Sequence, residues 1–201
     1  QNKSLEKLKY FQKKIKFLKC DFNKDKDIKK FVKNIKKLKI SSCVNLIGHI
    51  DNISYETFNI NNLLKTIKIN AAVPLYIQKN LLGFMKKNSF GRILNISSIG
   101  IKYGGGKNTF NYSISKHILE FIPSFSKNLA QNNILINNLR VGVTDTKIHK
   151  KIKSKNLRKR ISLIPLKRMA SRVEIAKFIY QLSSDENTYL TNETISISGG
   201  E

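Results

Sequence analysis

Residues 91–98 read GRILNISS, and residues 112–116, which follow a glycine-rich loop, read YSISK. The first stretch is a short apolar run that ends in two serines, a pattern typical of a strand in a parallel sheet. In the second stretch Tyr112 and Lys116 are four residues apart, so on a helix their side chains share one face. A strand, a serine, a loop and then such a helix bring all three groups to the carboxyl edge of the sheet. Open α/β folds bind their ligands at this edge.

Tyr112, Lys116 and Ser98 together predict an acid–base site. A tyrosine titrates near ~10, and a neighbouring cation favours its ionised form. We therefore expect Lys116 to lower the pKa of Tyr112 towards neutrality, where proton exchange with a substrate oxygen is most effective. Ser98 would hold that oxygen. The Tyr-x-x-x-Lys spacing alone more often belongs to an ordinary amphipathic helix in a lysine-rich chain, and it is the context that favours catalysis.

Hydrophobic periodicity along the whole chain alternates between the patterns of strands and helices. Such alternation predicts an α/β fold with a parallel sheet, covered on both faces and joined by right-handed crossovers. The expected helices are residues 25–38, 61–87 with a kink at Pro74, 111–131 and 173–183; the expected strands are residues 15–22, 42–47, 92–96, 135–139 and 194–198.

These motifs resemble, over nearly the whole chain, the classical branch of the short-chain dehydrogenase/reductase family, which includes the 3-oxoacyl-acyl-carrier-protein reductases. The resemblance implies a three-layered, doubly wound sheet of Rossmann type. It also implies an oxidoreductase that uses NAD or NADP to interconvert a carbonyl and an alcohol. The implied catalytic residues are Asn70 holding a water relay, Ser98 binding the substrate oxygen, Tyr112 exchanging the proton, and Lys116 lowering its pKa and binding the nicotinamide ribose. Ser97 is the rival of Ser98, although alternation along the strand would point it to the opposite side.

The same resemblance assigns residues to the cofactor. Residues 19–22 (KCDF) resemble a strand end beside the adenine, residues 44–48 (VNLIG) an Asn-Asn-Ala-Gly signature, and residues 140–146 (RVGVTDT) a segment whose threonine meets the nicotinamide carboxamide. Residues 195–200 (ISISGG) resemble the family's last strand. Leu46, Ile47 and Val141 depart from the family pattern, and the choice between NAD and NADP stays open. The implied cofactor-binding residues are Asp21, Asn45, Gly48, Tyr112, Lys116, Gly142, Val143 and Thr146.

The sequence contains no glycine-rich phosphate loop of the dinucleotide-binding type. Gly104, Gly105 and Gly106 follow the serine strand and do not join a first strand to a first helix. By resemblance, residues 4–14 and 15–22 correspond to the family's second helix and third strand. We therefore expect residues 1–201 to be one Rossmann-type domain whose first strands and phosphate loop belong to a longer chain.

The chain has 38 Lys and Arg against 13 Asp and Glu, a net charge of +25. Such a charge suits nucleic acid, but the lysines are spread over nearly every expected helix and arginine is scarce, so we expect only weak, salt-sensitive binding without sequence preference. A basic nucleic-acid-binding protein and an inactive binding or scaffold protein of the same fold remain as alternatives.

Residues 147–172 resemble the family's substrate lid. Their positive charge suits an anionic substrate, such as one linked to acyl carrier protein or coenzyme A, a carboxylate or a nucleotide sugar. The lysine bias of the whole chain explains this charge equally well.

The cysteines, the histidines and the apolar segments indicate the cellular setting and the assembly to expect. Cys20 and Cys43 fall on strands that the expected order holds apart, so we expect no disulfide and a reducing cytoplasm. The scattered histidines and cysteines predict no metal site, and no apolar run reaches the length of a membrane span. Helices 61–87 and 111–131 carry apolar residues on more than one face, which either core burial or a homodimer or homotetramer interface explains.

Overall fold

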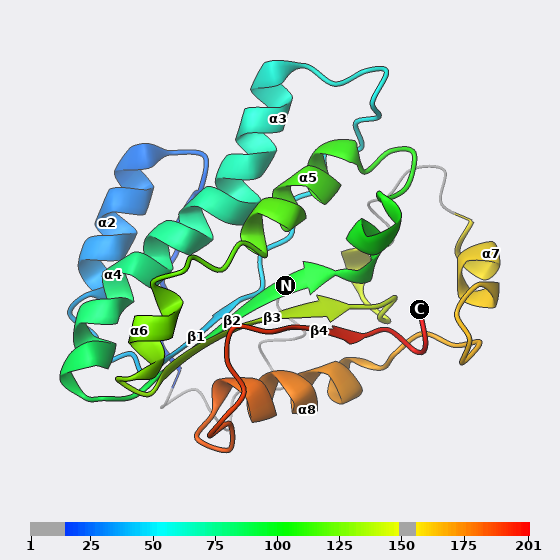
Figure 1. The fold of residues 1–201 in the computed structure, drawn as a ribbon. Helices are drawn as coiled ribbons and strands as arrows, with labels where there is room; N and C mark the ends of the chain where they lie inside the picture. The colour runs from blue at the N-terminus through cyan, green and yellow to red at the C-terminus, as the bar shows by residue number, and fades with distance from the viewer. Residues whose placement is uncertain (1–14, 149–155) are drawn as a thin grey trace.

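The computed structural model describes residues 15–148 and 156–201. Its centre is a parallel sheet of four strands in the order β1-β2-β3-β4 (Figure 1). The predicted α/β architecture with a parallel sheet is therefore confirmed. The strands are β1 (Ser42–Asn45), β2 (Gly91–Ser98), β3 (Ile134–Val141) and β4 (Thr194–Ile197).

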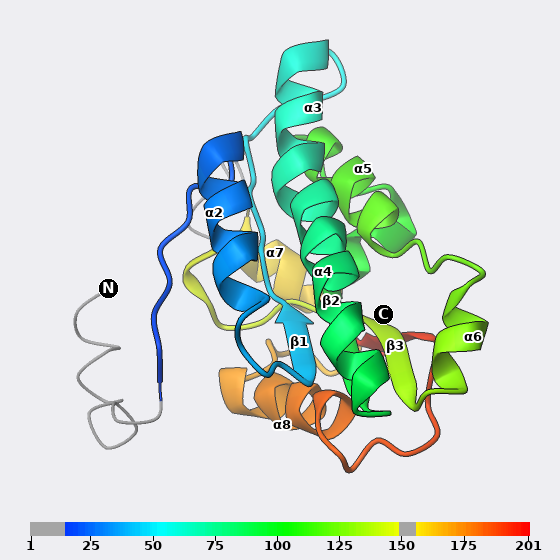
Figure 2. The same ribbon diagram turned by 90° about the vertical axis from the view of Figure 1, so that its left-hand side faces the viewer.

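Helices cover both faces of this sheet, as the two perpendicular views show (Figures 1 and 2). One face packs against α2 (Asp25–Ile35), α4 (Val73–Lys87) and α6 (Ser126–Ala130), with Ile93 of β2 in this core. The next residue, Leu94, points to the opposite face and packs in a second core against α8 (Arg172–Ser183). This alternation follows from the two-residue period of a strand.

The helix expected over residues 61–87 is interrupted at the predicted kink. It consists of α3 (Ile60–Ile67), a π-helical turn (Lys68–Ala72) and α4, which has Pro74 in its first turn. Proline has no N–H, so the regular α-helical hydrogen bond to the carbonyl of Asn70 cannot form. The chain instead widens, and the N–H of Val73 bonds to the carbonyl of Lys68. Such π-turns are rare and are frequent at functional sites.

Two expected elements are wrong. The single helix predicted over residues 111–131 is two helices, α5 (Phe110–Leu119) and α6, because Pro123 and the residue before it disfavour helical backbone. Residues 15–22 do not form a strand: although Leu18 and Phe22 pack on the core, no described segment lies beside them to complete a ladder. The expected helix over residues 4–14 lies outside the described residues.

The remaining boundaries differ by a few residues from the predictions. The strand and helix expected to end at Ile47 and Leu38 end at Asn45 and Ile35. A 3-10 turn (Ile99–Tyr103) follows β2, and α7 (Leu157–Ser162) lies in the expected lid region. Cys20 and Cys43 are free thiols. Within the described residues, no helix has the length and apolar character needed to cross a bilayer, and none of their His, Cys, Asp or Glu side chains cluster as a metal site.

Candidate active site

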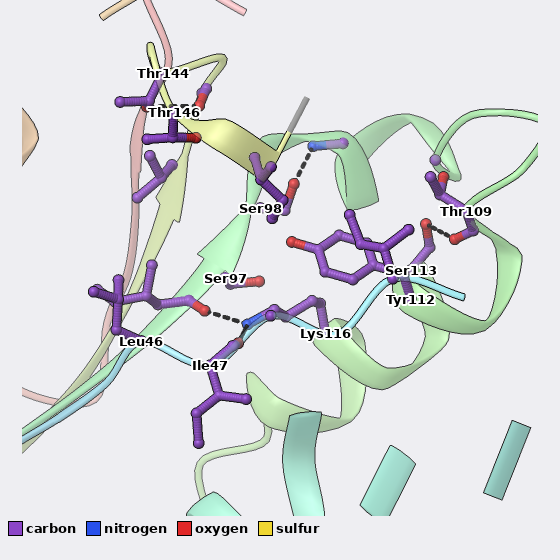
Figure 3. A pocket seen from close by; sticks show the side chains of 18 of the residues that line it. Leu46, Ile47, Ser97, Ser98, Thr109, Tyr112, Ser113, Lys116, Thr144 and Thr146 are labelled. Atoms are coloured by element: carbon purple, nitrogen blue, oxygen red, sulfur yellow. Dashed lines mark hydrogen bonds between the residues drawn. The ribbon is translucent and has the colours of Figure 1, made fainter. Parts of the chain in front are cut away.

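A cavity of about 440 Å³ opens at the carboxyl ends of β1, β2 and β3, beside α5 (Figure 3). This is the edge where the strand order predicts a ligand crevice. Its floor and walls combine apolar side chains with hydroxyl groups and one buried ammonium. The lining includes Leu46, Ile47, Gly48, Ile96, Ser97, Ser98, Gly105, Thr109, Tyr112, Ser113, Lys116, Val141, Gly142, Thr144, Thr146 and Ile148.

Ser98 and Tyr112 meet in this cavity. Ser98 ends β2 and caps the following 3-10 turn, where its Oγ accepts a hydrogen bond from the Gly100 N–H at 3.2 Å. The phenol of Tyr112 points from α5 towards Ser98 (Figure 3), and hydrogen bonding with Ser98 lowers the pKa of the phenol. The sequence predicted this meeting from the order strand, serine, loop and helix.

Lys116 lies behind Tyr112 and is 2% exposed. Its Nζ donates to the carbonyls of Ile47 and Ile96, each at 2.7 Å. Burial lowers the pKa of Lys116 to about 8, and the nearby negative charge of Glu120 opposes this shift. An ammonium has three N–H donors, so in the described structure one donor beyond these two bonds remains for a ligand.

The expected fall in the pKa of the Tyr112 phenol is not found in this structure. Burial raises the pKa of Tyr112, and the hydrogen bond with Ser98 only partly offsets that rise. The ammonium of Lys116 is directed at two backbone carbonyls, and its Nζ lies 5.9 Å from the centroid of the Tyr112 ring. Desolvation therefore decides the direction of the shift.

Asn70 lies in the π-turn and is fully buried. Its Oδ1 accepts from the His49 N–H at 2.7 Å, and its Nδ2 donates to the His49 carbonyl and to the Ser115 Oγ, each at 2.9 Å. The side chain thus links the loop after β1 to α5, one residue before Lys116, and does not line the cavity. Because Pro74 has no N–H, the backbone carbonyl of Asn70 is the group released from the regular helical pattern.

Ser97 also borders the cavity, which sequence reasoning did not expect. It is 4% exposed, and its Oγ has no hydrogen-bond partner among the described residues. Figure 3 shows Ser97 between the Tyr112 ring and Lys116. A buried hydroxyl without a partner is unfavourable, so Ser97 is a polar group that a ligand or water in the cavity would satisfy. Only the doubled serine at the strand end could have indicated it.

The residues predicted to bind the cofactor divide into two groups. Gly48, Gly142 and Thr146 line the cavity with Tyr112 and Lys116. Three others do not line it. Val143 is buried beside it, Asp21 accepts two hydrogen bonds from Asn23, which lower the pKa of its carboxyl group, and Asn45 donates to Asn95 at 2.9 Å.

The cavity suits a nucleotide with a flat ring. Apolar side chains line its walls, and hydroxyl groups and the ammonium of Lys116 supply donors on one side. At Gly142 the backbone passes very close to β4, where an added Cβ would lie 2.7 Å from the Ser198 Cα. A glycine here lets the chain turn past β4 towards Thr144 and Thr146, whose hydroxyls border the cavity. The donor set therefore fits a dinucleotide cofactor.

Comparisons with known proteins agree with this geometry. A family model described as enoyl-(acyl carrier protein) reductase matches residues 1–201. This match and the relatives below show that the chain belongs to the short-chain dehydrogenase/reductase family.

Among its relatives is the 3-oxoacyl-(acyl-carrier-protein) reductase FabG of Buchnera aphidicola subsp. Schizaphis graminum, 33% identical over 78% of this chain and 61% of the relative. The chain thus spans less than two thirds of that relative's length. The crystal structure of YwfH, an NADPH-dependent reductase involved in bacilysin biosynthesis, matches with a TM-score of 0.78 at 27% identity, over 91% of this chain and 76% of YwfH.

A 3-oxoacyl (acyl-carrier-protein) reductase from Agrobacterium tumefaciens C58, solved with NADP bound, has the same fold. Its TM-score is 0.78 at 19% identity, over 90% of this chain and 72% of that protein.

Proposed function

We propose that the protein containing this chain is an NAD- or NADP-dependent oxidoreductase that interconverts a carbonyl and an alcohol. The observation that carries the proposal is the meeting of Ser98, Tyr112 and Lys116 in one cavity at the carboxyl edge of a parallel sheet. An inactive scaffold has no need to keep a buried ammonium beside a half-buried phenol, since polar groups are costly to bury. Membership of the family supports the same activity.

Each group has a chemical role in this proposal. Because its pKa is raised, the Tyr112 phenol is protonated at neutral pH, the form that can give a proton to the oxygen of a carbonyl being reduced. Ser98 binds that oxygen beside Tyr112. The nicotinamide cofactor supplies the hydride when bound. Lys116 is held by the carbonyls of Ile47 and Ile96 and directs its remaining donor at the cofactor ribose.

In this proposal Asn70 acts through its main-chain carbonyl and not through its side chain. Its side chain is committed to His49 and Ser115, so its amide cannot also bind a water in the cavity. The main-chain carbonyl, without its regular helical donor because of Pro74, is the acceptor available for the relay water. The water would link Lys116 to solvent as the proton on Tyr112 is replaced.

We propose fewer cofactor-binding residues than the sequence predicted. Tyr112, Lys116, Gly48, Gly142 and Thr146 line the cavity and would bind the nicotinamide half. Asp21 and Asn45 lie outside the cavity, so their contact with the adenosine half stays a prediction from the family resemblance, as does that of Val143.

The substrate class and the oligomeric state are also proposals. The names of the FabG relatives favour a substrate carried by acyl carrier protein, and the described lid region contributes the basic Lys147, Arg158 and Lys159. Residues 149–155 of the expected 147–172 lid lie outside the described residues. Exposed Ile60 and Leu64 on α3 fit the expected homodimer or homotetramer interface.

The test uses protein expressed from the complete open reading frame that contains these residues. NADH and NADPH fluorescence titrations measure cofactor binding, and loss of absorbance at the nicotinamide band measures turnover with acetoacetyl-CoA. Ethyl acetoacetate, which has the same reacting carbonyl without the charged carrier, is the matched comparison. We expect turnover with at least one cofactor, and a lower KM for the anionic substrate. Cofactor binding without any carbonyl reduction across a panel of ketones and ketoesters would contradict the proposal.

A further inference from the structure

Hydrogen-bonded polar side chains cross the sheet in a single line. Asn45, Asn95, Asn138 and Thr194 occupy paired positions on β1, β2, β3 and β4. Asn45 Nδ2 donates to Asn95 Oδ1 at 2.9 Å, Asn95 Nδ2 to Asn138 Oδ1 at 3.0 Å, and Asn138 Nδ2 to Thr194 Oγ1 at 3.0 Å. We call these four residues the amide line. The three asparagines are fully or almost fully buried, so each bond is made away from bulk water.

The amide line also holds the end of α5. Asn138 Nδ2 donates to the carbonyl of Glu120 at 2.8 Å, and Asn95 Nδ2 donates more weakly to the carbonyl of Leu119 at 3.4 Å. Leu119 is the last residue of α5 and Glu120 is its C-cap. Carbonyls at a helix end have no donor within their own helix, so β2 and β3 supply the donors that α5 lacks.

A second link joins β3 to the same point of α5. Arg140, two residues after Asn138, forms a two-pronged ion pair with the Glu120 carboxylate, with N–O distances of 2.6 to 3.1 Å. The Glu120 side chain is 8% exposed. Glu120 is therefore held by its main chain through Asn138 and by its side chain through Arg140.

The other end of α5 is also attached. Asn111 is fully buried and donates from Nδ2 to the Asp51 carboxylate at 2.7 Å. Tyr112 and Lys116 lie between this attachment and the amide line. Both ends of the helix that presents the acid–base pair are thus fixed by buried polar contacts, and neither contact involves the cavity itself.

The site needs this precision. Lys116 reaches the Ile96 carbonyl at 2.7 Å, and Ile96 is the neighbour of Asn95 on β2. A helix rises 1.5 Å per residue, so a slip of α5 by even part of one residue would break that bond and move Tyr112 away from Ser98. Misplacement by about 1 Å can cost on the order of a hundredfold in rate.

We propose that Asn138 is a positioning residue for the proposed reaction: with Asn95 it caps α5 from beneath and so fixes Tyr112 and Lys116 against Ser98. The inference rests on the proposed function for its kinetic consequence. Its structural part, the anchoring of α5 by β3, stands independently of the reaction.

The chain offers a closely matched control in Asn137. It is the preceding residue of β3, equally buried, and its amide makes two hydrogen bonds, to the Leu190 carbonyl at 2.8 Å and from the Glu193 N–H at 3.1 Å. These partners precede β4 and lie away from α5. Asn137 and Asn138 therefore differ in what they hold and not in residue type, strand or burial.

The experiment compares Asn138→Ala with Asn137→Ala in protein from the complete open reading frame, at a temperature where both are folded. We expect similar falls in melting temperature. Asn138→Ala should lower kcat about tenfold or more with little change in the KM for cofactor, while Asn137→Ala should keep kcat within about twofold. Asn138→Ser and Asn137→Ser replace the alanine variants if either alanine variant fails to fold.

Amide hydrogen exchange, measured without cofactor or substrate, gives the independent readout. Exchange in residues 110–119 should become at least about tenfold faster in the Asn138 variant and stay unchanged in the Asn137 variant. Equal kinetic losses in the two variants, or unchanged exchange of α5 in the Asn138 variant, would overturn the proposal. If wild-type protein reduces no carbonyl, the proposed function fails and the exchange comparison alone decides whether Asn138 anchors α5.

Discussion

Two cationic side chains, Arg92 and Lys116, are buried near opposite ends of β2, and only Lys116 borders the cavity. Arg92 at the amino end is 1% exposed and donates to the carbonyls of Asn187, Gly91 and Asn133 at 2.8 to 2.9 Å. Lys116, near the carboxyl end, is 2% exposed and donates to the carbonyls of Ile47 and Ile96. Burial and carbonyl partners are thus common to both.

The difference lies in the surroundings and in the titration of the two groups. Arg92 stacks over the Phe90 ring at 4.3 Å and does not border the cavity. Burial lowers its pKa, but a guanidinium stays charged at any physiological pH. Lys116 faces the cavity with a pKa of about 8. A buried cation therefore indicates a functional site only where it meets a cavity and can change its charge.

The largest expected effect is on stability and concerns Arg92. Arg92→Met would remove three hydrogen bonds from a buried guanidinium to main-chain carbonyls, of which that of Asn133 keeps another donor, the Gly91 N–H. The free energy of unfolding should therefore fall by about 3 kcal/mol. Turnover per folded molecule should stay near the wild-type value. Urea unfolding followed by circular dichroism, with the folded fraction used to correct the rate, measures both quantities. A large loss of rate in fully folded Arg92→Met would remove the distinction between the two cations.

The next effect is on rate and concerns the cavity end. Tyr112→Phe removes the proton that the substrate oxygen receives, and kcat should fall by about a hundredfold or more. Tyr180→Phe, an exposed tyrosine on α8, is the control and should keep the wild-type rate. Lys116→Met should lower the rate and weaken cofactor binding as well, whereas Tyr112→Phe should chiefly lower kcat. Near wild-type turnover by Tyr112→Phe would show that the proton comes from another group.

How far the sequence predicts this molecule depends on the range of the interactions involved. The parallel sheet, the kink at Pro74 and the meeting of Ser98 with Tyr112 follow from local pattern and from one family resemblance. The break at Pro123 was missed because the apolar period continues across it. The strand expected at residues 15–22 was wrong because a strand requires a partner, which is not a property of its own residues.

The sequence also could not predict which hydrogen bonds the buried polar groups would form. Spacing correctly placed Lys116 near Tyr112, but it could not show that the ammonium would be taken up by the carbonyls of Ile47 and Ile96. The direction of the shift in the Tyr112 pKa is set by burial, which spacing along a helix does not reveal. The amide line has the same character: Asn95 and Asn138 are distant in sequence, and only the strand register makes them neighbours.

A pH-dependent stability difference should separate the two cations further. The pKa of Lys116 is about 8 in the folded chain, below its ordinary value. Between pH 8 and the ordinary pKa of a lysine, the Lys116 amine is charged in the unfolded chain and largely neutral in the folded chain. The unfolded chain therefore binds more protons, so the free energy of unfolding increases as pH rises through this range and decreases as pH falls. Wild type should gain about 1.5 kcal/mol relative to Lys116→Met between pH 8 and 9.5.

Urea unfolding of both proteins at several pH values measures this difference. The raised pKa values of Cys43 and Tyr112 act on both proteins alike and cancel in the comparison. Arg92→Met should show no such trend against wild type, because the guanidinium keeps its charge over the whole range. A flat difference between wild type and Lys116→Met would mean that the ammonium is not destabilised by burial.

The smallest expected effect separates the two serines at the end of β2. Ser98 bonds with Tyr112 and accepts from Gly100, so Ser98→Ala should lower kcat about tenfold or more. The Ser97 hydroxyl is buried without a partner in the described structure, and its removal relieves a desolvation cost. Ser97→Ala should therefore raise the free energy of unfolding by up to about 1 kcal/mol and keep kcat within about twofold. Thermal melts and steady-state rates of both variants measure this, and an equal loss of kcat in Ser97→Ala would instead assign the substrate oxygen to both hydroxyls.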